Sequence, residues 1–132
     1  MKKILLDTNA YSSFLKGDEK VLEIIGESDL IYLSVFVLAE LFYGFKSGTR
    51  EKNNKNNLKK FLRKPGVSIL EATVETSGIF ANVKFSLRKS GNPLPINDVW
   101  IASHVIESGS ELITFDHHFL KVSGLRLWDG IN

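Results

Sequence analysis

Four acidic residues, far apart in the chain, have the chemistry to form one site. Asp7 and Asp116 each end a short apolar run that is typical of a buried strand. Glu40 shares a helical stripe with apolar residues, and Asp98 opens a helix after a proline-stiffened loop. Because parallel strands end at one edge of a sheet, where ligands bind, we expect these carboxylates to converge there.

Four carboxylates close together repel one another, which raises their pKa values unless cations are present. Oxygen-only ligands of this kind suit Mg²⁺ or Mn²⁺ and suit zinc poorly. Such a site could deprotonate a water molecule and stabilise charge on a phosphodiester, most effectively with two ions about 4 Å apart. The acidic set therefore predicts a metal-assisted hydrolytic site.

Each residue of the set also has a simpler interpretation. Asp7 could only cap the helix that starts near Thr8, since Asp is common at that position. Glu40 could lie at the border of its apolar stripe and reach water. The pair His117 and His118 suggests zinc at first sight, but an exposed loop pair is the simpler interpretation, and His104 has no evident partner.

The elements that must position these residues alternate between strands and helices, which predicts a three-layer α/β fold with a parallel sheet. Val74 is among the residues expected to face inward from a long helix at 73–90. We expect strands at 4–6, 30–33, 67–70, 112–115 and 125–127, and helices at 9–16, 19–26, 35–46, 50–64, 73–90 and 97–108.

A basic stretch between the two halves of the chain has two interpretations. The simpler one is a solvated helix face. The other is an arm that contacts phosphates, and its asparagines, at 53, 54, 56 and 57, suggest a mobile hairpin rather than a rigid helix. The candidate phosphate contacts are Lys46, Arg50, Lys55, Lys59 and Lys60.

Composition limits the class of protein. At 132 residues the chain fits a single domain, 1–132, and 43% hydrophobic residues are ordinary for a globular protein. It has no cysteine, which excludes disulfides and thiolate metal sites and suits a cytoplasmic location. No apolar run is long enough to span a membrane. The net charge of +2 conceals a clear basic excess outside the acidic set, as in nucleic-acid enzymes.

These features resemble the PIN-domain ribonucleases, and within them the VapC-type toxins of toxin–antitoxin modules. The matching segments are spread over nearly the whole chain. They are Leu6-Asp7-Thr8-Asn9, Ala39-Glu40-Leu41 with Gly44, Leu94-Pro95-Ile96-Asn97-Asp98-Val99-Trp100-Ile101-Ala102, and Thr114-Phe115-Asp116. The segment around Asp98 is the most distinctive of them.

The resemblance implies a five-stranded parallel sheet of order 3-2-1-4-5 and an endoribonuclease that depends on Mg²⁺ or Mn²⁺. It makes Asp7, Glu40, Asp98 and Asp116 the catalytic metal ligands. It further implies a cognate VapB-like antitoxin, a homodimer, and structured RNA substrates, often transfer RNA, cut in single-stranded loops. The small polar residues that would orient carboxylates and waters are Thr8, Asn9 and Thr114.

Other classes of protein remain to be separated from this one. A phosphoacceptor signalling domain also places an Asp at a strand end, but it would leave Glu40 unexplained. A haloacid-dehalogenase-like phosphatase needs an Asp where this chain has Asn9. A non-catalytic PIN-fold module that only binds proteins is the third alternative. Cleavage of RNA with Mg²⁺ or Mn²⁺, stopped by a chelator, would separate the nuclease from all three.

Overall fold

The computed structural model describes residues 1–131 and has a parallel sheet at its centre. Its strands are β1 (Lys3–Leu6), β2 (Leu30–Ser34), β3 (Val67–Leu70) and β4 (Glu111–Ile113), in the order β3-β2-β1-β4. β1 pairs with both β2 and β4, so it lies inside the sheet. Its apolar residues Ile4, Leu5 and Leu6 are fully buried, as the sequence predicts for a strand covered on both faces.

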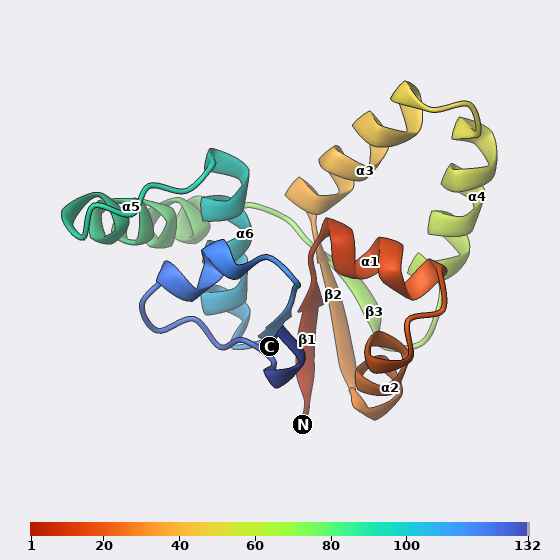
Figure 1. Cartoon of the computed structure of the whole chain (residues 1–132), viewed down its shortest axis with the longest axis horizontal. Helices are drawn as coiled ribbons and strands as arrows, with labels where there is room; N and C mark the ends of the chain where they lie inside the picture. The colour runs from red at the N-terminus through yellow and green to blue at the C-terminus, as the bar shows by residue number, and fades with distance from the viewer. Residues whose placement is uncertain (132) are drawn as a thin grey trace.

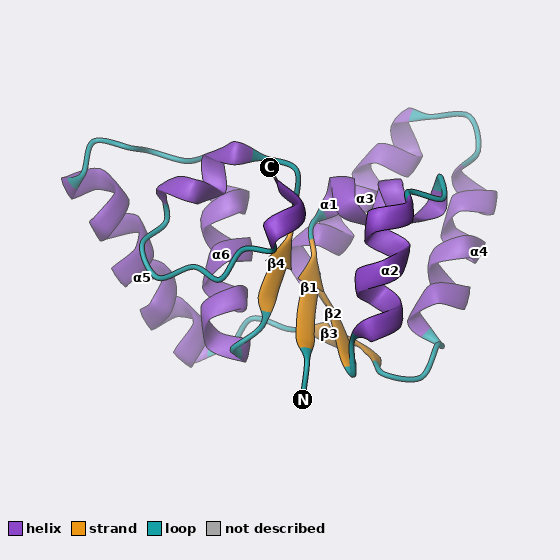
Figure 2. Ribbon diagram, turned by 60° about the horizontal axis from the view of Figure 1, so that its bottom comes forward, coloured by secondary structure: helices purple, strands orange, loops and turns teal. Residues whose placement is uncertain are grey.

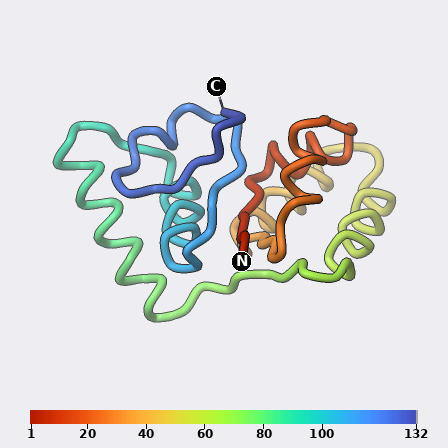
Figure 3. The backbone as a smooth tube through the Cα atoms, turned by 90° about the horizontal axis from the view of Figure 1, so that it is seen from below, coloured from red at the N-terminus to blue at the C-terminus, as the bar shows by residue number. Residues whose placement is uncertain are grey.

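Six α-helices surround the sheet and confirm the three-layer α/β class. Figures 1 and 3 show α5 and α6 on one side of the sheet and α1, α2 and α4 on the other, which follows from right-handed crossovers that reverse direction after β3. Their bounds are α1 (Thr8–Leu15), α2 (Glu19–Glu27), α3 (Val35–Ser47), α4 (Glu51–Leu62), α5 (Val74–Lys89) and α6 (Ile96–Ser108).

The predicted fifth strand, 125–127, is wrong. This segment makes one isolated parallel bridge, between Leu112 and Leu127, and the sheet has four strands. The Leu112 amide donates to the Arg126 carbonyl at 2.7 Å, and the Trp128 amide donates to the Leu112 carbonyl at 3.1 Å. A 3₁₀-helix, Asp129–Ile131, follows at once, so the segment turns away before a ladder can form. Figure 2 shows it as a loop beside β4.

The basic stretch forms the helix predicted at 50–64, present here as α4, and its asparagines do not interrupt it as the alternative of a hairpin suggested. α4 is continuous through its asparagines because Leu58 and Phe61 are buried against the rest of the protein. Phe61 packs on Tyr11 and Phe14 of α1, with ring centroids 5.3 and 5.1 Å apart. Tertiary packing thus overrides the low helix propensity of asparagine.

Several boundaries differ slightly from the prediction. β4 ends at Ile113, so Thr114 lies just beyond it, and α5 begins at Val74, whose side chain is 85% exposed rather than inward-facing. Gly66 (φ +81°) makes the turn into β3, where a Cβ would lie 2.7 Å from the Asp29 carbonyl oxygen. No helix within residues 1–131 is long and apolar enough to cross a membrane.

Candidate active site

Asp7 lies at the carboxyl end of β1 and is 6% exposed. Its Oδ1 accepts a hydrogen bond from the Ala10 amide at 2.8 Å, so Asp7 does cap α1. Its Oδ2 accepts a hydrogen bond from the Thr114 hydroxyl, and its own amide donates to the Ile113 carbonyl at 3.2 Å. The cap and the candidate site therefore coexist, because each carboxylate oxygen has its own partner.

Glu40 is half-buried on α3, and its Oε1 accepts a hydrogen bond from the Thr8 hydroxyl at 2.6 Å. Thr8 is the first residue of α1, directly after Asp7. This bond ties α3 to the end of β1 and holds the Glu40 carboxylate near that edge. Asn9, the other small polar residue predicted here, is exposed.

Asp98 and Asp116 reach the site from the other side of the sheet. Asp98 is half-buried in the first turn of α6. Asp116 caps the short 3₁₀-helix His117–Lys121, and its Oδ1 accepts from the His118 amide at 2.9 Å. The Asp116 amide donates to the Thr114 hydroxyl oxygen at 3.0 Å. Thr114 thus connects Asp7 with Asp116.

Shifts in pKa link the four carboxylates electrostatically, with Asp98 connecting Glu40 to the two others. The pKa of Asp7 is raised to about 6, mainly by burial and in part by the charges of Asp116 and Asp98, against the hydrogen bonds from Thr114 and Ala10. Burial also raises the pKa of Asp98 to about 6, again with help from Asp116 and from Glu40. The predicted acidic residues therefore form one region of negative charge, termed here the carboxylate site.

His118 is a nearby residue whose contact the sequence does not predict. Its Nδ1 lies 3.0 Å from Asp116 Oδ1, and its proximity lowers the pKa of Asp98. Its position two residues after Asp116 was a signal for this contact, but the sequence favoured an exposed loop pair, and both histidines are indeed exposed. His118 is the one basic group among the causes that shift Asp7 and Asp98.

A divalent cation fits this donor set, because two of its carboxyls are held near pKa 6 by burial and by neighbouring negative charge. A cation would favour their ionised forms. Within residues 1–131, however, no three Asp, Glu or His side chains are arranged closely enough to bind one ion together. The fold brings the four acids to one edge of the sheet without grouping three of them around one point.

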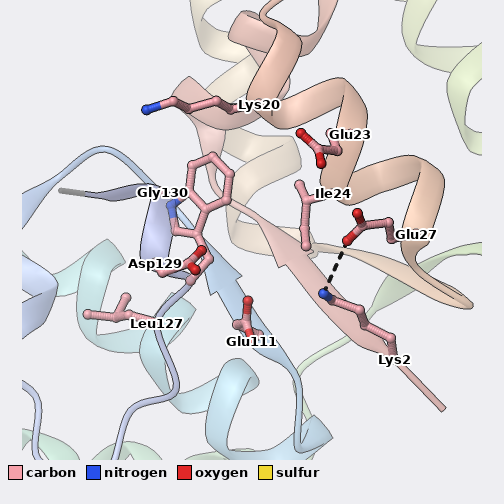
Figure 4. A pocket seen from close by; sticks show the side chains of 10 residues that line it. Lys2, Lys20, Glu23, Ile24, Glu27, Glu111, Leu127, Asp129 and Gly130 are labelled. Carbon is pink, nitrogen blue, oxygen red and sulfur yellow. Dashed lines mark ion pairs between the residues drawn. The ribbon is translucent and has the colours of Figure 1, made fainter.

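A large cleft lies elsewhere in the described chain. It has a volume of about 660 Å³ and contains none of the four carboxylates of the site. Figure 4 shows it beside the start of β1 and β4, so it lies at the opposite, amino-terminal edge of the sheet. We call it the amino-edge cleft; it is lined by Lys2, Lys20, Glu23, Ile24, Glu27, Glu111, Leu127, Trp128, Asp129 and Gly130.

The candidate phosphate contacts lie on the hairpin of α3 and α4, which extends beyond the carboxyl edge of the sheet in Figure 1. Two of them are engaged within the protein, since Lys46 and Lys55 lie 3.5 and 3.2 Å from Glu51 Oε2. Arg50 precedes α4, and Lys59 and Lys60 lie in its last turn, exposed. Among the described residues, Lys46 and Lys55 are therefore paired with an acid, whereas Arg50, Lys59 and Lys60 are not.

Comparison with known proteins identifies relatives of this chain. Two curated relatives are each 29% identical to this chain. "Ribonuclease VapC2" of Rickettsia felis matches 82% of this chain and 81% of its own length. "Ribonuclease VapC2" of Haemophilus influenzae matches 96% of each.

Solved structures share the fold. The structure of VapBC2 from Rickettsia felis bound to a promoter DNA fragment has a TM-score of 0.83 at 27% identity, covering 96% of this chain and 99% of that one. VapBC-1 from nontypeable Haemophilus influenzae has a TM-score of 0.86 at 23% identity, covering 98% and 99%. The family model for the PIN domain matches residues 4–125. This chain therefore belongs to the PIN-domain family.

Proposed function

We propose that this protein is an endoribonuclease toxin that depends on Mg²⁺ or Mn²⁺ and is neutralised by a VapB-like antitoxin. The observation that carries the proposal is the carboxylate site: four acids from separate elements of a PIN domain, with the pKa values of Asp7 and Asp98 raised to about 6 by burial and by their acidic neighbours. The proposal is supported by the two 29% identical relatives named Ribonuclease VapC2.

The residues of the site would have two roles, binding the cation and orienting the carboxylates. Asp7, Glu40, Asp98 and Asp116 would hold the cation, which when bound supplies Lewis acidity and an activated water for phosphodiester hydrolysis. Thr114, which donates to Asp7 and accepts from the Asp116 amide, would keep those two carboxylates oriented. Thr8 would do the same for Glu40 through its 2.6 Å hydrogen bond.

The proposed substrate is RNA with an accessible single-stranded loop, transfer RNA being one candidate. A recessed site at a sheet edge can reach a phosphate that is splayed out of a helix more easily than one within a duplex. Cations on α4, Lys59 and Lys60 above all, would hold flanking phosphates without sequence preference.

The proposed protein partners are an antitoxin and a second copy of this chain. The antitoxin is supported by the fold shared with VapBC complexes, in particular the VapBC2 structure at 27% identity. A homodimer is supported by exposed apolar residues, among them Phe42, Val74 and Phe85 at 41%, 85% and 55% exposure. Sedimentation of the purified protein, alone and with the product of the neighbouring reading frame, tests both partners.

The decisive experiment incubates purified protein with a transfer RNA and with a matched fully duplex RNA. We expect cleavage of the transfer RNA in Mg²⁺ or Mn²⁺, none in excess EDTA, and recovery when the metal is restored. Cleavage that persists in EDTA would contradict the metal dependence. Absence of cleavage on a panel of single-stranded and structured RNAs, in protein shown to bind Mn²⁺, would favour the non-catalytic binding module instead.

A further inference from the structure

His104 is fully buried in the middle of α6, and both of its ring nitrogens have partners. Its Nδ1 lies 2.7 Å from the Ser34 hydroxyl oxygen, and its Nε2 lies 3.2 Å from the Glu71 carbonyl oxygen. Neither partner is evident from the sequence, because Ser34 and Glu71 are distant from His104 in the chain. The buried imidazole, with a hydrogen bond at each ring nitrogen, therefore joins three segments of the chain at one point.

The partners determine which nitrogen carries the proton. The Glu71 carbonyl can only accept, so Nε2 must donate to it. Ser34 Oγ already accepts from the Phe36 amide at 3.1 Å, and its hydroxyl proton is then available for Nδ1. Burial lowers the pKa of His104, against smaller opposing effects of the Glu71 carbonyl and Glu107. The ring is therefore neutral, with Nδ1 as an acceptor and Nε2 as a donor.

This arrangement connects the two helices that carry half of the carboxylate site. Ser34 is the N-cap of α3, which carries Glu40. His104 lies on α6, which carries Asp98. The hydrogen bond between Ser34 and His104 therefore runs directly from the start of one helix to the body of the other.

An aromatic stack reinforces the same junction. The Trp100 ring of α6 lies between Phe36 of α3 and Phe80 of α5, with centroids 4.9 and 3.9 Å away. The Phe36 ring is also 5.6 Å from that of His104. Stacked rings can slide over one another at little cost, whereas a hydrogen bond of 2.7 Å fixes direction as well as distance. The His104 bond is thus the contact that sets the register of α3 on α6.

We infer that His104 is a positioning residue of the nuclease site, which acts through Ser34 to fix Glu40 on α3 relative to Asp98 on α6. The inference rests on the function proposed above. Loss of the bond would let the two carboxylates drift apart without removing either, and misplacement of about 1 Å is enough to slow an enzyme by up to about 100-fold.

Three substitutions of His104 distinguish the effects of its two hydrogen bonds. His104→Asn keeps an amide oxygen near the position of Nδ1, where it can accept from Ser34. His104→Gln keeps an amide N–H near the position of Nε2, where it can donate to the Glu71 carbonyl. His104→Leu removes both bonds.

A matched control is available at Thr76, which is also fully buried. Its hydroxyl donates to Glu107 Oε1 at 2.7 Å and so joins α5 to α6, away from α3. Thr76→Val should therefore weaken the packing of α5 on α6 and the capping box at the start of α5, where the Thr76 hydroxyl accepts from the Thr73 amide at 3.0 Å, without changing the register of α3 on α6.

The experiment measures kcat, KM, the Kd for Mn²⁺ and the thermal midpoint of each variant, with the kinetic and binding assays run well below that midpoint. We expect His104→Leu and His104→Gln to lower kcat about tenfold or more and to raise the Kd for Mn²⁺ by a similar factor, with KM for RNA little changed. His104→Asn should recover most of both, and Thr76→Val should lose stability only.

Equal losses of kcat in His104→Leu and Thr76→Val, at equal losses of stability, would overturn the inference. So would wild-type kcat and Mn²⁺ affinity in His104→Leu. If that variant does not fold, Ser34→Ala replaces it, with the same expectations.

Nitrogen NMR of the wild-type ring gives a check that needs no activity: a proton on Nδ1 contradicts the inference. If the wild-type protein binds Mn²⁺ but cleaves no RNA, the proposed function fails and the Mn²⁺ affinities alone decide the role of His104.

Discussion

The carboxylate site and the amino-edge cleft lie at opposite edges of one sheet, and both are rich in acidic residues. In the amino-edge cleft two lysines lie among four acids, and Lys2 Nζ lies 3.6 Å from Glu27 Oε2 (Figure 4). In the carboxylate site the basic side chain that lies close to an acid is His118, and the pKa values of Asp7 and Asp98 are raised to about 6, mainly by burial.

The number of acids therefore does not distinguish the two regions. What distinguishes them is how far the acids are removed from water and from basic partners. In the carboxylate site Asp7 and Asp116 cap helices with their side chains and Glu40 accepts a hydrogen bond from Thr8, whereas Glu23 and Glu27 of the cleft lie on the exposed surface of α2. Substitutions in one region, with controls in the other, test that contrast.

The largest expected effect is on catalysis. Asp98→Asn should lower RNA cleavage by about 100-fold or more, because it removes a charge that holds the proposed cation. Asp7→Asn should do the same. Glu23→Gln, in the amino-edge cleft, is the matched control and should leave the rate of cleavage unchanged. The measurement is single-turnover cleavage of a labelled transfer RNA; full activity in both aspartate variants would remove them from the site.

A smaller effect is expected on stability with metal. Mn²⁺ at 100 times its Kd should raise the free energy of unfolding by about 2.7 kcal/mol if it binds only the folded protein. Asp98→Asn should lose most of that gain and Glu23→Gln should keep it. Thermal unfolding with and without Mn²⁺ measures the difference, and an equal gain in both variants would place the ion away from the carboxylate site.

Without metal, Asp7 should make stability depend on pH. Its folded pKa of about 6 lies above the ordinary value of 3.8, so the folded state holds the proton more tightly than the unfolded one. Its contribution is greatest below pH 4 and is lost as the pH rises through about 6. The difference between the folded and the ordinary pKa corresponds to about 3 kcal/mol of stability. An Asp7→Asn variant would recover somewhat less than this, because Asn is a weaker acceptor for the Thr114 hydroxyl.

Denaturant unfolding in EDTA at pH 4 and pH 7.5 measures this effect. Relative to wild type, Asp7→Asn should be more stable by about 2 kcal/mol at pH 7.5 and should lose that advantage at pH 4. A constant difference between the two proteins at both pH values would show that burial of the Asp7 charge does not cost stability.

The smallest expected effect is on RNA binding. Lys59→Gln with Lys60→Gln should weaken binding and reduce the slope of log K against log salt by about 0.7 for each phosphate that is no longer neutralised. Lys55 is left unchanged because Glu51 already pairs with it at 3.2 Å. Lys20→Gln, in the amino-edge cleft, is the control. Titrations at several salt concentrations measure the slope, and an unchanged slope would make α4 a solvated helix face.

Much of the fold follows from local patterns. Short apolar runs predicted β1 to β4, and Asp7 was predicted as a possible cap of the helix that starts near Thr8, which it is. The fifth strand was predicted wrongly because an apolar segment of three residues can join a sheet by one bridge or by several, and only its neighbours decide. The helix at 50–64 was predicted correctly, but its asparagines suggested that it would not be rigid; the buried contacts of Leu58 and Phe61 outweigh that low propensity.

The sequence by itself determined the acidic residue types and their places at strand ends and helix starts, because these depend on local periodicity and capping. The tertiary structure decided which of them share an environment: it buried Asp7 against Thr114, linked Glu40 to Thr8, and provided His104 with its partners. Such contacts join residues that are far apart in the chain. Their distances depend on how the packed core orients each helix, and no local pattern encodes that orientation.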